Sequence, residues 1–299
     1  MIKTQKDNNI IWYDVVRPTQ QDMRVLQEEL KLHSLVVEEM KPRLHRSKLD
    51  LYSGYLFLVL HIPLLKKRGQ EVEVIELDGV IGKNWLVTNR YRDISAITQL
   101  QEKFTEYAAS PEFRAQPVAH LLYQILSTIM QDALSALDDV ESRIEHIEHT
   151  MFKGKEREMV LEISRLRRDI IDFRRITSPA RPVFRTLDDA GPALLGTETL
   201  PYFRNLTGKS EQIATLLKAQ KETIEALEQS NQALLTTNTN DIFRILTVFA
   251  SIALPLTLIA SLFGMNVDFP SFVNLWTILA AIVAVGIGMV LFFLKKKWL

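Results

Sequence analysis

Residues 245–263 read ILTVFASIALPLTLIASLF, and residues 269–294 read FPSFVNLWTILAAIVAVGIGMVLFFL, with no charged side chain in either stretch. A helix needs about 20 apolar residues to cross the hydrocarbon core of a bilayer. The two stretches therefore predict a hairpin of two membrane-spanning helices. Core helices of soluble proteins rarely run this long without a polar face, which disfavours the alternative that both stretches form a soluble core.

The charges that flank these stretches predict the orientation of the hairpin. Arg244 precedes the first stretch and Lys295, Lys296 and Lys297 follow the second, whereas the connecting segment carries only Asp268. Under the positive-inside rule, both ends lie in the cytoplasm. The first nine residues (MIKTQKDNN) lack the apolar core of a signal peptide. We therefore expect a multi-pass protein of the cell inner (plasma) membrane, with roughly the first 240 residues in the cytosol.

The composition excludes several classes of function. Residues 1–243 hold 32 basic and 35 acidic side chains, and the remaining residues hold four and one. Neither part has the concentrated basic face that nucleic-acid binding requires. The chain has no cysteine, which removes thiolate metal sites, disulfides and cysteine nucleophiles. No serine elbow, HExxH motif or phosphate-binding loop is present, so we expect neither an enzyme nor an organic cofactor.

Strand and helix patterns alternate in residues 1–110. Helical spacing follows Pro18, and we expect Pro63 to end a strand and Gly79 and Gly82 to mark turns. Apolar or alternating runs predict strands at residues 10–16, 55–62, 72–77 and 85–88, and the helix at residues 22–32. These patterns predict an α/β cytosolic domain with a mixed sheet.

Helix patterns replace strand patterns after about residue 90. We predict helices at residues 93–107, 118–151 and 156–177, the last two antiparallel and joined at residues 153–155. The residues expected to break the pattern after them are Pro179, Pro182, Gly191 and Pro192. Residues 111–201 are thus predicted to form a region of cytosolic helical hairpins.

A stem helix is predicted to run from residue 202 into the first apolar stretch and to end at residue 263. Apolar and amide side chains recur along it at alternating steps of four and three, as in a heptad seam: Ile213, Leu217, Gln220, Ile224, Leu227, Asn231, Leu234 and Asn238. A buried asparagine costs stability and fixes register. The asparagines nearest the membrane leave two interpretations open, a face that borders water and a solvated junction.

Two further groups of side chains are candidate metal ligands. His146 and His149, interleaved with Glu145 and Glu148, have a spacing compatible with zinc or nickel, although such a pair on a charged helix is more often unliganded. The other candidates are acids of the helical region and the stem, most of which we expect to be solvated: Asp132, Asp138, Asp139, Glu141, Glu222, Glu225 and Glu228.

Three motifs stand in the last part of the chain: TNTND at residues 237–241, Phe-Gly-Met-Asn at 263–266, and a terminal KKKWL. Gly-Met-Asn alone is a weak match, but at the outer end of the first of two spans it is specific. Together with the whole layout, these motifs resemble the CorA family of divalent-cation channels. The resemblance implies a homopentamer in which long helices form a cytosolic funnel, the first spans surround a pore and the second spans form an outer ring. It also implies an external loop at residues 264–271, a second span at 272–294 and a basic cytosolic tail at 295–299.

The same resemblance implies the site residues. Asn266 would contribute to a ring of five amides at the external mouth, with Gly264 and Met265 shaping its loop and Asp268 forming an electrostatic ring outside it. The implied pore-lining positions are Asn240, Leu246, Leu254 and Thr257. Departures from the family pattern are Phe263 in place of a common tyrosine, Phe243 and Leu254 where methionines occur, and Gln229 near the place of an expected sensor carboxylate.

Ion chemistry agrees with a ring of neutral amides. Mg²⁺ sheds its coordinated waters reluctantly, so neutral oxygens that accept hydrogen bonds from those waters recognise the hydrated ion and still release it. We expect passive uptake of Mg²⁺, and of Co²⁺ or Ni²⁺, driven by the membrane potential. The resemblance to the CorA family also implies gating by cytosolic divalent ion. Two alternatives stay open: a proton-coupled zinc transporter of the same family, whose members typically have Gly-Ile-Asn, and a membrane-tethered sensor or scaffold without transport.

Overall fold

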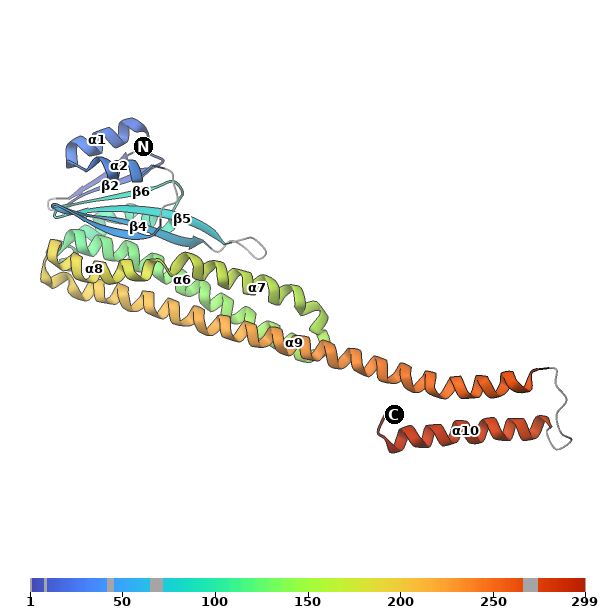
Figure 1. Ribbon diagram of the computed structural model, residues 1–299. Coiled ribbons are helices and arrows are strands. Elements are labelled where there is room, and N and C mark those ends of the chain that lie inside the picture. Colours follow the sequence, from blue (N-terminus) through green and yellow to red (C-terminus); the bar gives the residue numbers. More distant parts are fainter. Residues whose placement is uncertain (1, 8–9, 42–45, 65–71, 266–273, 299) are drawn as a thin grey trace. The chain divides into compact units, whose positions relative to one another are not determined.

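The computed structural model describes residues 2–7, 10–41, 46–64, 72–265 and 274–298, which divide into two compact units. The first unit runs to Leu227 and holds a six-stranded sheet and most of the helices (Figure 1). The second unit begins at Glu228 and holds the remainder of the longest helix together with the last helix. Each unit is described by itself below.

The sheet is mixed, as the sequence predicts. Its strand order is β1-β2-β6-β5-β4-β3, in which β2 and β6 are parallel and the other neighbouring pairs are antiparallel. The strands are β1 (Ile2–Asp7), β2 (Ile10–Val16), β3 (Lys48–Tyr52), β4 (Tyr55–Leu64), β5 (Glu73–Gly82) and β6 (Trp85–Arg90).

Helices cover both faces of the sheet (Figure 1). The helices α1 (Gln20–Leu30) and α2 (Ser34–Glu39) lie on one face, and the long helices lie on the other. Side chains alternate along a strand, so Tyr13 and Val15 of β2 join the buried cluster under α1 and α2. Trp12 points the other way, and its ring centroid lies 5.9 Å from that of Phe104.

The strand β4 continues through Pro63, so the predicted strand end is wrong. Pro63 pairs with Val74 of β5. Two residues earlier, the His61 N–H donates to Ser47 Oγ at 3.1 Å, on the side away from β5. Backbone directions alternate along a strand, so the backbone nitrogen of Pro63 faces the same side as the N–H of His61. The pairing of β4 with β3 on that side reaches only as far as Val59. The missing N–H of Pro63 therefore faces an edge that no described strand covers, where proline is tolerated.

Gly79 is not a turn residue, contrary to the prediction, whereas Gly82 ends β5. Gly79 pairs with Leu58 on one side and with Thr88 on the other, inside the sheet. A side chain at Gly82 would clash, because a Cβ there would lie 2.2 Å from the Trp85 ring. The first glycine thus belongs to a continuous strand, and the second leaves room for a tryptophan at the turn.

The remaining helices follow the sheet in sequence. They are α3 (Ser95–Glu102), α4 (Phe104–Ala108), α5 (Pro111–Ala115), α6 (Pro117–Thr150), the π-helical turn η1 (Met151–Lys155), α7 (Glu156–Thr177), α8 (Ala180–Leu195), the 3-10 turn η2 (Thr197–Thr199), α9 (Leu200–Phe263) and α10 (Leu275–Lys295). The predicted long helices at 118–151, 156–177 and 202–263 are confirmed, with ends that differ by at most two residues.

Two predicted features of the shorter helices are wrong. The helix expected at residues 93–107 is divided at Lys103. The division places the Phe104 ring edge-on to Phe113, with ring centroids 5.8 Å apart. The expected breaks at Pro182, Gly191 and Pro192 do not occur, because α8 runs through all three. Pro182 stands in the first turn, where no intrahelical N–H is needed, whereas Pro192 stands in the last turn and leaves the Asp188 carbonyl without its helical donor.

The heptad seam of α9 is buried as predicted over most of its length: Ile213, Leu217, Gln220, Ile224, Leu227 and Asn231 are buried. Leu234 is half-buried and Asn238 is exposed. Gln220 Nε2 donates to the Leu137 carbonyl at 2.8 Å and to a Glu141 carboxylate oxygen at 3.1 Å, both on α6. In the first unit, the seam therefore packs against a helix of the same chain.

A buried ion pair joins the parallel strands β2 and β6. Arg90 Nη2 donates to Asp14 Oδ2 at 2.9 Å, and both side chains are at most 3% exposed. Thr88 Oγ1 donates to Asp14 Oδ1 at 2.8 Å and accepts from Trp12 Nε1 at 3.0 Å. Because each charged group is hydrogen-bonded to its partner, the network is compatible with burial.

A second buried acid, Asp78 of β5, has no cationic partner of this kind among the described residues. Its Oδ2 accepts from Asn89 Nδ2 at 2.8 Å. Burial, and then the nearby Glu76 carboxylate, raise the pKa of Asp78 well above its usual range. The Asp78 carboxyl is therefore held toward its neutral form.

Candidate functional site

Two helices of the second unit have the length and apolar composition of membrane spans, the last part of α9 and α10. Their large side chains are mostly exposed within the chain; Phe249, for example, is 70% exposed and Trp276 is 78% exposed. Continuous apolar surface of this size is not stable in water. Both helices therefore require lipid or another protein surface around them.

The helix α10 runs beside the end of α9 and packs on one of its faces (Figure 1). Gly286 lies opposite Leu256, because a Cβ on the glycine would be 3.8 Å from the leucine side chain. The least exposed residues of α10 recur every three or four positions: Ile278, Ile282, Gly286, Met289 and Phe293. The shielded residues of α9 include Val248, Ile252, Pro255, Ile259 and Phe263, at the same kind of spacing. Each set thus forms one helical face.

The four predicted pore-lining residues point away from that packed face. At about 100° per residue, their directions lie roughly 100–160° from the middle of the α10-packed face. All four are exposed: Asn240, Leu246, Leu254 and Thr257. This side of α9 is therefore available to water, lipid or neighbouring chains.

Thr257 is the predicted site residue with a defined hydroxyl geometry. Its Oγ1 lies 2.9 Å from the carbonyl oxygens of both Ala253 and Leu254. The hydroxyl proton is therefore used within the helix, and the oxygen stays an acceptor for an outside donor. Pro255, in the same turn, has no N–H and so leaves the Ser251 carbonyl without its helical donor.

The predicted selectivity motif begins where α9 ends. The Gly264 N–H lies 3.0 Å from the Ala260 carbonyl and 3.2 Å from that of Ser261, and the Met265 side chain is 56% exposed. Asn266 and Asp268 lie outside the described residues. Gly264 and Met265 are thus placed directly after a membrane-length helix, as the sequence predicts.

The basic tail ends α10 with a hydrogen-bonded cap that the sequence analysis missed. Lys297 has φ +55°, the left-handed conformation of a helix-terminating residue. Its N–H donates to the Leu294 carbonyl at 3.1 Å, and the Trp298 N–H donates to that of Phe293 at 3.0 Å. Trp298 and Phe293 also contact each other, with ring centroids 6.1 Å apart. No glycine marks this cap, so the usual sequence signal was absent.

The candidate metal ligands on α6 and α9 do not converge among the described residues of one chain. In the part of the chain that the structure describes, no group of three or more His, Asp or Glu side chains is placed to hold a metal ion. His146 and His149 are both exposed on α6. Several of the acids have other partners, as Glu225 shows with Lys221 at 3.1 Å. Burial raises the pKa of Asp132, which disfavours its charged form.

Known proteins resemble the chain over nearly its full length. The profile of the CorA-like Mg2+ transporter protein family matches residues 7–296. The cobalt/magnesium transport protein CorA of Thermotoga maritima is 26% identical over 90% of this chain and 77% of its own length. The complete CorA magnesium transporter of Methanocaldococcus jannaschii has a TM-score of 0.83 at 20% identity, covering 99% of this chain and 93% of that one.

A solved cytoplasmic domain named ZntB also has a similar fold. The ZntB cytoplasmic domain from Vibrio parahaemolyticus has a TM-score of 0.64 at 15% identity, over 77% of this chain and 90% of that chain. Identity this low shows likeness of fold alone. The match of the family profile to residues 7–296, by contrast, includes both apolar helices and the Gly-Met-Asn motif. The chain belongs to the CorA-like Mg2+ transporter protein family.

Proposed function

We propose that five copies of this chain form a passive channel for hydrated divalent cations, Mg²⁺ first and Co²⁺ or Ni²⁺ also, with the free side of α9 around the pore. The observation that carries the proposal is the division of α9 in the second unit. One side packs on α10, whereas the opposite side carries Asn240, Leu246, Leu254 and Thr257 and is exposed. This division is the one expected if α9 surrounds a central pore with its exposed side and α10 packs on its outer side.

Each proposed pore residue has a distinct chemical role. The Asn240 amide and the Thr257 oxygen accept hydrogen bonds from the waters around the ion, because neutral acceptors bind a hydrated cation and release it. Leu246 and Leu254, 57% and 68% exposed within one chain, form apolar constrictions that close the path by dewetting. Asn266 forms the external amide ring, and Asp268 raises the local cation concentration outside it.

The membrane potential supplies the driving force. An inside-negative potential contributes about 2.3 kcal/mol per elementary charge per 100 mV, and about twice that for a dication. Uptake therefore needs no nucleotide, in agreement with the lack of a phosphate-binding loop in the sequence. Both termini lie in the cytoplasm of the cell, and the protein resides in its inner (plasma) membrane, with Lys295, Lys296 and Lys297 on the inner side.

Gating by cytosolic divalent ion requires sites between copies. Since the described residues of one chain hold no group of three or more carboxylates and histidines suited to a metal, ligands from neighbouring subunits would have to complete such a site. When the cytosolic ion falls, those sites empty and the pore opens. Mg²⁺ is thus the transported ion and a regulatory ligand.

A proton-coupled zinc transporter is the second candidate, favoured by the fold shared with the ZntB domain. The test is uptake by the purified full chain in liposomes, with Mg²⁺, Co²⁺ and Zn²⁺ offered separately, with and without a pH gradient. We expect potential-driven Mg²⁺ uptake that is independent of the pH gradient. Zinc uptake that needs the gradient and ignores added Mg²⁺ would favour the alternative. If the vesicles are impermeable to all three ions, the remaining hypothesis is a membrane-tethered sensor or scaffold without transport.

Variants separate the roles of the residues. Asn266→Ala should lose flux or ion discrimination, whereas Gln212→Ala, an exposed amide in the first unit, should behave like the unmodified chain. Because the chain has no cysteine, single cysteines report the pore face directly. Cadmium should block flux through Leu254→Cys but not through Ile252→Cys, which faces α10. The reverse pattern would refute the proposed orientation of α9.

A further inference from the structure

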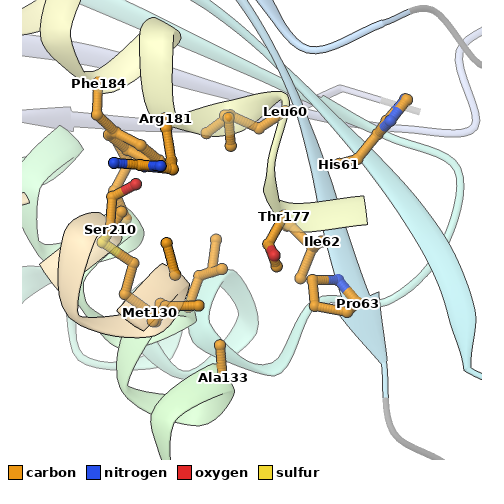
Figure 2. A pocket seen from close by; sticks show the side chains of 15 residues that line it. Leu60, His61, Ile62, Pro63, Met130, Ala133, Thr177, Arg181, Phe184 and Ser210 are labelled. Carbon is orange, nitrogen blue, oxygen red and sulfur yellow. The ribbon is translucent and has the colours of Figure 1, made fainter. Parts of the chain in front are cut away.

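A cavity lies in the first unit between the sheet and the helices beneath it. Strand β4 and the helices α6, α7, α8 and α9 all contribute to its lining (Figure 2). Its volume is about 50 Å³. Most of the lining is apolar, with Ile62, Ile129, Met130, Phe184 and Ile213 among its side chains. Strand and helices thus leave a small apolar space at the place where they meet.

Polar groups are few in the lining of this cavity. Figure 2 shows Arg181 and Ser210 on one side of it and Thr177 on the opposite side, whereas the His61 ring points away. The Thr177 hydroxyl is occupied by the Phe173 carbonyl at 3.0 Å. Ser210 is only 7% exposed, and its hydroxyl has no protein hydrogen bond among the described residues. A buried hydroxyl of this kind favours a ligand that supplies its partner.

Arg181 differs from the arginine one turn further along α8. Arg185 donates to Glu211 at 2.7 Å, so its charge has a protein partner. Arg181, at the cavity, has no ion pair with any of the described residues. Its charge is nevertheless close enough to Glu211 to contribute, after the bonded Arg185, to the lowered pKa of that carboxyl. A guanidinium that makes no direct ion-pair contact, beside an apolar cavity and a buried hydroxyl, is complementary to a carboxylate attached to an apolar tail.

We propose that this cavity binds a short aliphatic carboxylate, with its head at Arg181 and Ser210 and its tail among Ile62, Ile129 and Met130. The volume sets the class of ligand. A group the size of one water takes about 10–15 Å³ of such space, so roughly three to five carbons fit and a large ring system does not. The carboxylate stays at the exposed Arg181 side chain, where its charge is only partly desolvated. The site touches β4 and α9 together, and occupancy therefore bridges the sheet and the stem helix of the first unit.

The absence of cysteine provides the assay. Ala214→Cys places one thiol in the cavity lining, and Ala219→Cys places one on the exposed surface of the same helix. The full chain, purified in detergent, is labelled with N-ethylmaleimide and followed by intact mass spectrometry. Pentanoate is the probe. Pentanol, which has the aliphatic tail without the carboxylate, and acetate, which has the carboxylate without the tail, are the controls. Because labelling does not measure ion flux, its result is separate from that of the transport experiments.

We expect pentanoate to slow labelling at Ala214→Cys and to leave Ala219→Cys unchanged. Arg181→Gln should raise the pentanoate concentration needed for half protection about tenfold, the usual effect of losing a charged hydrogen bond. Arg185→Gln, the matched control, should leave that concentration unchanged. Three outcomes would each overturn the proposal: no protection by pentanoate, equal protection by pentanol, or unchanged protection in Arg181→Gln.

Discussion

The buried ion pair between Asp14 and Arg90 should dominate the stability of the sheet. In Arg90→Met, the Asp14 carboxylate keeps the Thr88 hydroxyl, at 2.8 Å, but loses a partner that donates at 2.9 Å. The Asp14 side chain is 0% exposed, so water cannot replace the arginine. Removing one member of a buried pair costs about 3–5 kcal/mol. In a unit of this size, each kcal/mol lowers the melting temperature by about 2–4 °C, which gives a decrease of roughly 6–20 °C.

Thermal unfolding of the full chain, followed by near-ultraviolet circular dichroism, measures this effect, because Trp12 belongs to the same network. The matched control is Arg92→Met. Arg92 pairs with Glu73 but is 57% exposed, so its loss should cost less than about 1 kcal/mol.

The double variant Asp14→Asn/Arg90→Met tests the cause. It removes the stranded charge and keeps an oxygen that can accept from Thr88, so it should recover more than half of the lost stability. If Arg90→Met melts like Arg92→Met, or if the double variant is as unstable as the single one, then a stranded buried charge is not the cause.

Four other substitutions test single features of the first unit. The pKa of Asp78 is higher in the folded state than in the unfolded state. Its contribution to stability is therefore full below about pH 3.8 and falls as the pH rises through the folded-state pKa. Asp78→Asn should flatten that decline when melting curves are measured as a function of pH. Gly191→Ala would place a Cβ 2.5 Å from the Phe203 ring and should cost about 1–3 kcal/mol, whereas Gly208→Ala, with no atom within 4 Å, should stabilise its helix by up to about 1 kcal/mol in the same denaturation assay. Gln220→Met should change stability by less than about 1.5 kcal/mol, because it removes a buried amide whose Oε1 has no partner in the described structure; a loss above 3 kcal/mol would show that the bonds of Nε2 dominate.

Local patterns predicted the long helices and the central strands because their signals lie within the element itself. The stripe in residues 118–151 and the heptad steps of α9 are periodic over many turns, and tertiary packing then buries the same positions. Breaks were harder to predict. Pro63 and Pro182 both occupy places where an N–H is dispensable, and that depends on neighbours or on the distance to the start of a helix.

Pairings between distant residues were not readable from the sequence. Asp14 and Arg90 are 76 positions apart, and their contact follows from the parallel register of β2 and β6. The cavity residues Arg181 and Ser210 likewise come from different helices and carry no motif. The candidate pore residues came from a family resemblance, and their common side on α9 became visible only when the burial of the opposite face was known. Asn266, the central residue of the proposed filter, stays a prediction.

The amides along α9 occupy two physical environments, although the sequence shows one polar seam. Gln220 and Asn231 are buried, whereas Asn238 and Asn240 are exposed. A buried amide is stable only with hydrogen bonds, and Gln220 obtains two from α6, which fixes the register between the two helices. An exposed amide such as that of Asn240 has no such constraint and can bind water. The seam therefore changes from a structural to a solvent-accessible role between residues 231 and 238, before the first apolar stretch begins at residue 245.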